Sequence, residues 1–106
     1  MQRIERLRLV IRGAVQGVGF RPFVYRLAVE LELQGWVGNS AGGVTVEVEG
    51  DSAQHELFRR RLAAEKPANA SIYSLEIVHL DPAGYSGFQI KESSGGPKTT
   101  IILPDI

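Results

Sequence analysis

Segments with two different hydrophobic periods follow one another along this chain, and their order limits the fold to a few possibilities. Apolar and polar residues alternate through residues 5–12 and 44–49, a pattern that is typical of half-buried strands, and residues 71–80 are expected to form another strand. Shorter strands are expected at 36–37 and at 88–91. A turn over residues 40–43 should join the second strand to the third.

The first helix is indicated by apolar residues at a spacing of three and four. This stripe, which should face the core, consists of Val24, Leu27, Ala28 and Leu31. Pro22 is expected to open the helix, where its missing N–H costs nothing. Gly35 is placed to end it in a left-handed conformation.

The second helix is indicated by a possible capping box. Asp51 is followed three residues later by Gln54, and the helix should run to about Glu65. The residues expected to face inward are Leu57, Phe58 and Leu62.

The predicted order is strand, helix, strand, strand, helix, strand. This order favours the α+β class and a ferredoxin-like βαββαβ sandwich, in which two helices cover one face of an antiparallel sheet. The other face should carry polar side chains. We expect Arg8 and Arg12 of the first strand to pair there with Glu47 and Glu49 of the third.

The chain of 106 residues suits one domain, which we expect to span residues 1–92. Residues 93–106 resemble a linker and tail that lead toward downstream domains absent from this chain. Since the domain is complete without that tail, deletion of residues 97–106 should leave the fold intact.

Composition excludes several kinds of function. The chain has no cysteine, which rules out disulfides, thiolate metal ligands and cysteine nucleophiles within it. Its net charge is zero, which argues against broad nucleic-acid binding. No apolar run is long enough for a membrane span, and a cytoplasmic location is the default expectation.

Positive charge gathers at the start of the chain. Residues 1–26 contain six arginines and a single acidic residue, Glu5, which leaves an excess of five positive charges. Such a local excess favours a small anion near this end of the chain.

A glycine-rich segment at residues 13–22 joins the first strand to the first helix. Backbone N–H groups in such a turn, together with a helix N-terminus, can bind an anion. Gly17 and Gly19 permit the required backbone angles, and the planar guanidinium of Arg21 matches phosphate oxygens. The dinucleotide-binding pattern fails because Pro22 replaces its third glycine, and no P-loop is present.

Simpler interpretations exist for each of these residues. The glycine-rich segment could be only a tight connection, Arg21 a surface arginine and Asn39 a turn residue. His55 and His79 have no partner pattern, so we expect both to be structural or exposed to solvent.

Residues 15–21 and 35–39, with Gly43 and Gly50, resemble the signature segments of the acylphosphatase family. The resemblance covers roughly residues 5–92 and implies the ferredoxin-like fold. It also implies that Arg21 binds phosphate and that Asn39 is catalytic, with no metal ligands and no cofactor in this chain. The phosphate cradle implied by the resemblance consists of Val15, Gln16, Gly17, Val18, Gly19, Phe20 and Arg21.

The chemistry of an acyl phosphate suits so small a set of residues. The leaving group is a carboxylate whose conjugate acid has a pKa of about 4, so it needs no general acid. Stabilising the phosphoryl charge and aligning a water should suffice. The proton acceptor could be the phosphate of the substrate itself, which the sequence does not decide.

Residues 21–28 and 101–106 resemble a narrower group, the N-terminal domain of hydrogenase-maturation carbamoyltransferases and the segment that follows it. This resemblance implies carbamoyl phosphate as the substrate, inorganic phosphate as a product and downstream domains of the same polypeptide as partners. It also implies a role in making the cyanide ligands of [NiFe]-hydrogenases.

Two alternatives remain open. One is a stand-alone acylphosphatase of broad specificity, against which Pro22 and the extra tail argue. The other is a non-catalytic anion-binding module on the same fold, for instance an RNA binder. The outward residues of the third strand, Thr45, Glu47 and Glu49, disfavour RNA because they offer neither stacking rings nor positive charge.

Overall fold

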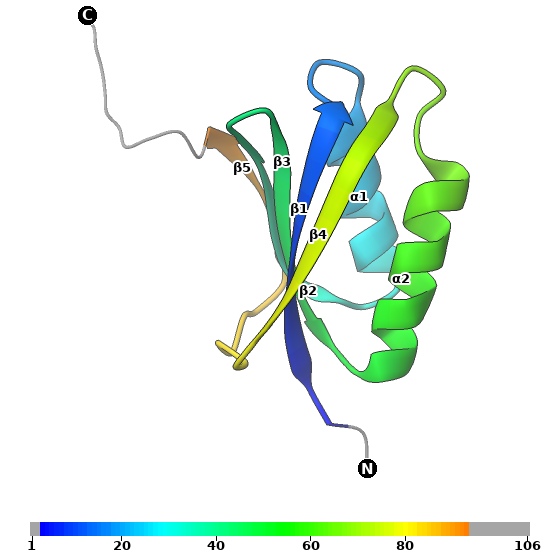
Figure 1. Cartoon of the computed structure of the whole chain (residues 1–106). Helices are drawn as coiled ribbons and strands as arrows, with labels where there is room; N and C mark the ends of the chain where they lie inside the picture. Colours follow the sequence, from blue (N-terminus) through cyan, green and yellow to red (C-terminus); the bar gives the residue numbers. More distant parts are fainter. Residues whose placement is uncertain (1–2, 94–106) are drawn as a thin grey trace, which may run out of the picture.

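The computed structural model describes residues 3–93 and the side chains of residues 3–91. Residues 3–93 form five strands and two helices (Figure 1). The elements are β1 (Glu5–Ala14), α1 (Phe20–Glu30), β2 (Gln34–Ser40), β3 (Gly43–Gly50), α2 (Ser52–Glu65), β4 (Ser71–Leu80) and β5 (Phe88–Ser93). Residues 94–106, which include most of the expected tail, lie outside the described part of the chain. No helix within residues 3–93 is long and apolar enough to cross a membrane.

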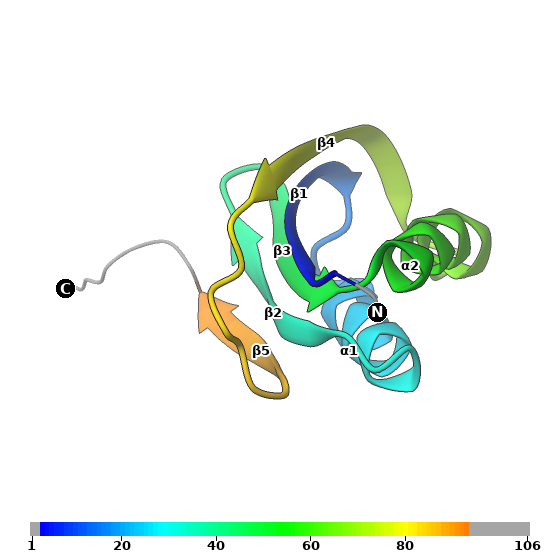
Figure 2. The same ribbon diagram turned by 90° about the horizontal axis from the view of Figure 1, so that it is seen from below.

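The strands form one sheet in the order β4-β1-β3-β2-β5. Neighbouring strands among the first four run antiparallel, whereas β5 runs parallel to β2. Both helices cover the same face of this sheet (Figure 2). The ferredoxin-like prediction is therefore confirmed, but a wholly antiparallel sheet is wrong. The reason is that residues 81–87 carry the chain across the open face, from β4 at one edge to the outer side of β2.

Apolar side chains on one face of the sheet pack against apolar side chains of the two helices, and together they form a single core. Val44, Val46 and Val48 of β3 are fully buried beneath the helices. The remaining buried apolar residues are Leu7, Leu9, Ile11, Val15, Phe20, Phe23, Val24, Leu27, Ala28, Leu33, Val37, Phe58, Leu62 and Ala70.

The N-terminus of α1 differs in detail from the prediction. The helix begins at Phe20, two residues before Pro22, and Gly19 caps it in a left-handed conformation with φ of 80°. Pro22 is thus the third helical residue. It still loses no hydrogen bond, because the first four N–H groups of a helix have no intrahelical partner.

The C-terminus of α1 is formed by Glu32 rather than Gly35. Glu32 adopts a φ of 61°, its N–H donates to the Val29 carbonyl, and the Leu33 N–H donates to the Ala28 carbonyl. This pair of bonds is a Schellman motif. Gly35 lies inside β2 instead, where a Cβ atom would meet the Glu47 carbonyl oxygen at 1.9 Å. Gly35 thus permits the close approach of β2 to β3.

The second helix confirms the predicted capping box. Asp51 accepts a hydrogen bond from the Gln54 N–H, and Gln54 accepts one from the Asp51 N–H. Phe58 and Leu62 are buried as predicted. Leu57 is 40% exposed, so its inward placement was wrong. A stripe at spacing three and four through Phe58 and Leu62 leaves Leu57 to one side of the buried face.

Polar side chains occupy the open face of the sheet, as predicted, but only one expected pair forms there. Arg8 lies directly opposite Glu47 and forms an ion pair with it at 2.8 Å. Arg12 pairs instead with Glu76 of β4, at 3.5 Å. Glu49 is buried and accepts hydrogen bonds from backbone N–H groups of residues 83–85. The pairing predicted for Arg12 and Glu49 is therefore wrong, because β4 and residues 81–87 supply closer partners.

Candidate active site

The loop between β1 and α1, the β2–β3 hairpin and the end of β5 lie at one end of the molecule (Figure 1). The loop, the first turn of α1 and the end of β2 carry the residues that the sequence places in the site. The N-terminus of α1 lies at this end, and the positive end of the helix dipole favours an anion there.

The loop is anchored by the two apolar residues at its ends. Val15 and Phe20 are both buried in the core. Between them, Gly17 and Gly19 adopt φ angles of 75° and 80°. A Cβ atom at either glycine would meet nothing within 4 Å. These two glycines are therefore needed for their backbone conformation and not for space.

Gln16 fixes this loop to the neighbouring hairpin. Its Nε2 donates to the carbonyl of Ser40 at 3.1 Å and to that of Gly43 at 2.8 Å. The side chain of this cradle residue is thus engaged with the protein itself. Its effect is to hold the loop against the β2–β3 turn, next to Asn39.

Arg21 is the second residue of α1 and its side chain is partly exposed. Its Nη1 donates to the backbone carbonyl of Lys91 at 3.1 Å. The guanidinium therefore reaches from the helix N-terminus across to the end of β5.

Asn39 lies near the end of β2, opposite Val44 of β3 and Ser93 of β5. Side chains two residues apart on a strand share a face, so Asn39 points to the same side as the buried Val37, toward α1. Its Oδ1 is buried and accepts no hydrogen bond from any described residue. Buried polar atoms normally have a hydrogen-bond partner, so this oxygen is an exception that calls for an explanation.

These placements bring Arg21 and Asn39 to the same short stretch of β5. Lys91, which receives the Arg21 hydrogen bond, pairs with Gly38, the residue before Asn39. Arg21 and Asn39, the two functional residues predicted from the sequence, thus lie near the ends of β2 and β5. Both are on the face of the sheet that the helices cover.

The two histidines take structural or exposed positions. His55 is buried in α2, and its Nε2–H donates to the Glu5 carbonyl at 2.8 Å. His79 is exposed on β4. Within residues 3–93, no group of three or more acidic or histidine side chains could hold a metal ion.

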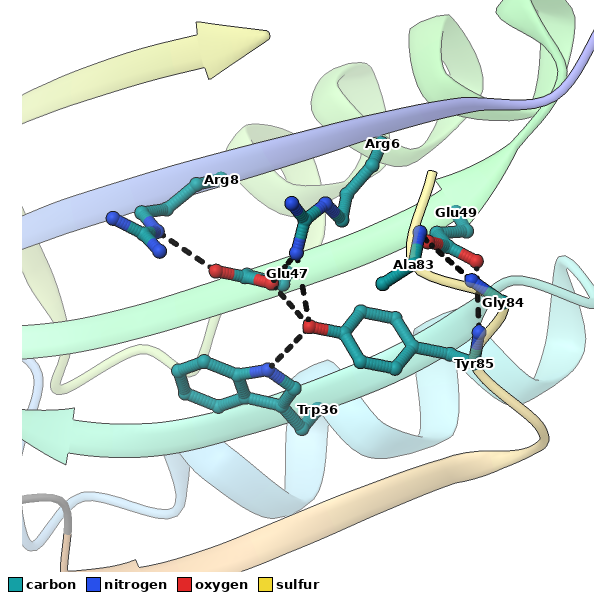
Figure 3. Close-up of polar contacts among 8 residues, drawn as sticks. All are labelled: Arg6, Arg8, Trp36, Glu47, Glu49, Ala83, Gly84 and Tyr85. Carbon is teal, nitrogen blue, oxygen red and sulfur yellow. Dashed lines mark hydrogen bonds and ion pairs between the residues drawn. The ribbon is translucent and has the colours of Figure 1, made fainter. Parts of the chain in front are cut away.

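A second polar cluster lies on the open face of the sheet (Figure 3). Glu47 is only 2% exposed and pairs with both Arg6 and Arg8. Burial by itself raises the pKa of Glu47. Hydrogen bonds from Tyr85 and Arg8 and the two guanidinium charges outweigh that effect and lower its pKa below the ordinary value of 4.5.

The sequence reasoning missed Lys91 and Tyr85. No periodic pattern marks residues 81–87, and their positions depend on contacts with strands 36 to 79 residues earlier in the chain. A glycine-rich composition around Tyr85 was the one available signal, and it indicated only a loop.

Comparison with known proteins agrees with the fold. The acylphosphatase family model matches residues 7–90. The chain is 48% identical to the carbamoyltransferase HypF of Rhizobium leguminosarum bv. viciae over 102 residues, which are 96% of this chain and 13% of that protein. It is 39% identical to an acylphosphatase of Moorella thermoacetica over 91 residues, which are 85% of this chain and 97% of that enzyme.

A solved structure shows the same relationship. The crystal structure of full-length HypF in its phosphate- and nucleotide-bound form superposes with a TM-score of 0.84 and 34% identity. The match covers 91% of this chain and 13% of that protein. The chain thus spans about an eighth of the length of the carbamoyltransferases that it matches. With its signature loop, its ferredoxin-like fold and a family match over most of its length, the chain belongs to the acylphosphatase family and resembles the N-terminal domain of HypF carbamoyltransferases.

Proposed function

We propose that this chain hydrolyses acyl phosphates, with Arg21 binding the phosphate and Asn39 orienting the attacking water. The observation that carries this proposal is the placement of both residues at one end of β5, with the Asn39 Oδ1 buried and accepting no hydrogen bond from the described residues. Loop residues 15–20 would surround the same space with backbone N–H groups.

The phosphate would be held by two kinds of donor. Backbone N–H groups of the loop and of the first turn of α1 would bind its oxygens, supported by the helix dipole. The Arg21 guanidinium would add charge-assisted hydrogen bonds. Both sets stabilise the charge that spreads over the phosphoryl oxygens as the bond breaks.

Asn39 would fix the position of the water. The Oδ1 accepts a hydrogen bond from a water O–H, so that the water oxygen lone pair faces the phosphorus. A P–O bond forms to the water as the P–O bond to the acyl group breaks. The carboxylate leaves with the bonding electrons, and the water proton passes to a phosphate oxygen or to solvent. Holding a water in this geometry lowers the entropic part of the barrier.

Similarity to HypF supports carbamoyl phosphate as the substrate. Hydrolysis would then give carbamate and inorganic phosphate within a larger carbamoyltransferase, in which later domains of the same polypeptide would be the partners of this one. We place this activity in the cytoplasm, in keeping with a chain that has no cysteine. A second candidate, a stand-alone acylphosphatase of broad specificity, is favoured by the match to nearly the whole Moorella enzyme.

The test is hydrolysis of benzoyl phosphate and carbamoyl phosphate by the purified chain. We expect Arg21→Ala and Asn39→Ala to lose roughly 100-fold or more in kcat/KM while staying folded. Exposed residues of the same kinds supply matched controls, Arg26→Ala on α1 and Asn69→Ala in the loop before β4, which should keep wild-type activity. A folded but inert wild type would reject catalysis by this chain. The ratio of the two substrates separates the carbamoyltransferase domain from the general enzyme.

A further inference from the structure

The Lys91 carbonyl, which accepts the Arg21 hydrogen bond, belongs to β5, an edge strand of the sheet that the described part of the chain forms. β5 has six residues, and among the strands of residues 3–93 it pairs only with β2, in parallel. Parallel pairing is slightly less stable per residue than antiparallel pairing. The position of the Lys91 carbonyl therefore also depends on the contacts that hold β5 in place besides its pairing with β2.

Residues 81–87, here named the strap, lead into β5 across the open face of the sheet (Figure 2). The Glu49 carboxylate accepts hydrogen bonds from the N–H groups of three consecutive strap residues, 83–85. The Gly35 N–H donates to the Gly87 carbonyl at 2.9 Å, just before β5 begins. These contacts set the residue at which β5 starts to pair with β2, and so its register.

The strap also holds the Trp36 side chain of β2, through the hydroxyl group of Tyr85. The Tyr85 Oη accepts from Arg6 and from the Trp36 Nε1, each at 3.3 Å, and donates to Glu47 (Figure 3). A phenol has one donor and two acceptor lone pairs, and all three are used here. The Trp36 indole is therefore fixed by a fully satisfied hydroxyl.

The Trp36 ring in turn contacts Lys91. The Lys91 Nζ lies 4.2 Å from the centre of this ring, a cation–π contact. Lys91 also packs closely on Gly38, its partner on β2, where a Cβ atom would come within 3.2 Å of the Lys91 Cβ. The Lys91 side chain is thus fixed by contacts on the open face of the sheet. The carbonyl of the same residue accepts the hydrogen bond from Arg21, which belongs to α1 on the opposite face.

We propose that Tyr85 and Trp36 are positioning residues for phosphate binding, which act by holding Lys91 so that its carbonyl orients the Arg21 guanidinium. The inference rests on the proposed role of Arg21. Tyr85 and Trp36 do not touch the phosphate themselves. Their effect arises because a planar guanidinium binds phosphate well only in a narrow range of orientations.

The test is the Kd of inorganic phosphate, measured by calorimetry on the whole chain. Tyr85→Phe removes the hydroxyl and changes no charge, and we expect it to weaken binding roughly fivefold. Tyr73→Phe is the matched control, because Tyr73 is 79% exposed on β4 and should keep the wild-type Kd. Trp36→Phe removes the indole N–H and reduces the ring, and it should weaken binding in the same way.

The same changes in an Arg21→Lys background show whether the effect passes through the guanidinium. A lysine has no planar fork to orient, so the loss from Tyr85→Phe should fall below about twofold. An equal loss in both backgrounds, or an unchanged Kd in folded Tyr85→Phe, overturns the inference. If Tyr85→Phe fails to fold, Trp36→Phe decides by the same criteria. Wild-type phosphate affinity in Arg21→Lys and Arg21→Ala would instead reject the proposed function itself.

Discussion

Arg8 and Glu47 face each other across the β1–β3 pair, and the Arg8 Nε donates to the Glu47 Oε2 at 2.8 Å. A carboxylate as buried as Glu47 is unfavourable unless it is paired and hydrogen-bonded. This pair, together with Arg6 and Tyr85, satisfies that requirement and ties the first strand to the third and to the strap.

We predict that Glu47 makes the stability of the domain depend on pH. Because its folded pKa is lowered, its contribution is present above the unfolded pKa of 4.5 and is lost as the pH falls through the folded pKa. The free energy of unfolding of wild type, measured with urea, should therefore exceed that of Glu47→Gln near neutral pH. The difference should shrink as the pH falls below 4.5.

Glu76→Gln is the control for this experiment, since Glu76 pairs with Arg12 in an exposed position at 3.5 Å. Its effect on stability should stay within about 0.5 kcal/mol at neutral pH. A difference between wild type and Glu47→Gln that stays constant down to acid pH would contradict the assignment.

Gly35→Ala should destabilise the fold severely. Gly35 has a φ of 146°, and a Cβ atom there would lie 1.9 Å from the backbone oxygen of Glu47, so β2 and β3 would have to separate. We expect a loss of more than about 3 kcal/mol in the free energy of unfolding, or failure to fold.

Gly42→Ala separates conformational strain from lack of space. Gly42 has a φ of 74° in the β2–β3 turn, and a Cβ atom at this residue would meet nothing within 4 Å. Only the strain of a left-handed residue remains, about 1–2 kcal/mol. A larger loss of unfolding free energy in urea for Gly42→Ala than for Gly35→Ala would contradict this prediction. It would mean that the close approach of β2 to β3 at Gly35 matters less than backbone strain.

Phe58 and Leu57 are neighbours on α2 with opposite environments. Phe58 is fully buried, so Phe58→Ala should cost about 3–5 kcal/mol of unfolding free energy. Leu57 is exposed, and Leu57→Ala should change stability by no more than about 0.5 kcal/mol. Comparable losses from the two changes would mean that α2 is rotated about its axis relative to this structure.

Asn39→Asp should impair phosphate binding more than Asn39→Ala does. The new carboxylate would lie at the same end of β5 as Arg21, where its charge would repel the phosphate and compete for the guanidinium. We expect KM for benzoyl phosphate to rise roughly tenfold above that of Asn39→Ala at low ionic strength, and less in salt. The control, Asn69→Asp, lies on an exposed loop and should leave KM unchanged. Equal KM values for Asn39→Asp and Asn39→Ala would place the phosphate away from this residue.

Local patterns in the sequence determined the order of the elements and most of the core. Alternation along residues 44–49 and the stripe through Val24 and Leu27 follow directly from the two side-chain periods, which depend on neighbouring residues alone. The Asp51–Gln54 capping box is local for the same reason, since both partners lie within one turn. The Arg8–Glu47 pair followed once the strand order was assumed.

The tertiary structure alone decided which distant groups meet. The path of residues 81–87 set β5 parallel to β2, and this placed the Lys91 carbonyl against Arg21. It also gave Glu49 its backbone partners, while Gly35 became a point of close strand approach and not a helix end. The physical reason is that a loop without periodicity is positioned by long-range hydrogen bonds, whose partners no local pattern of residues identifies.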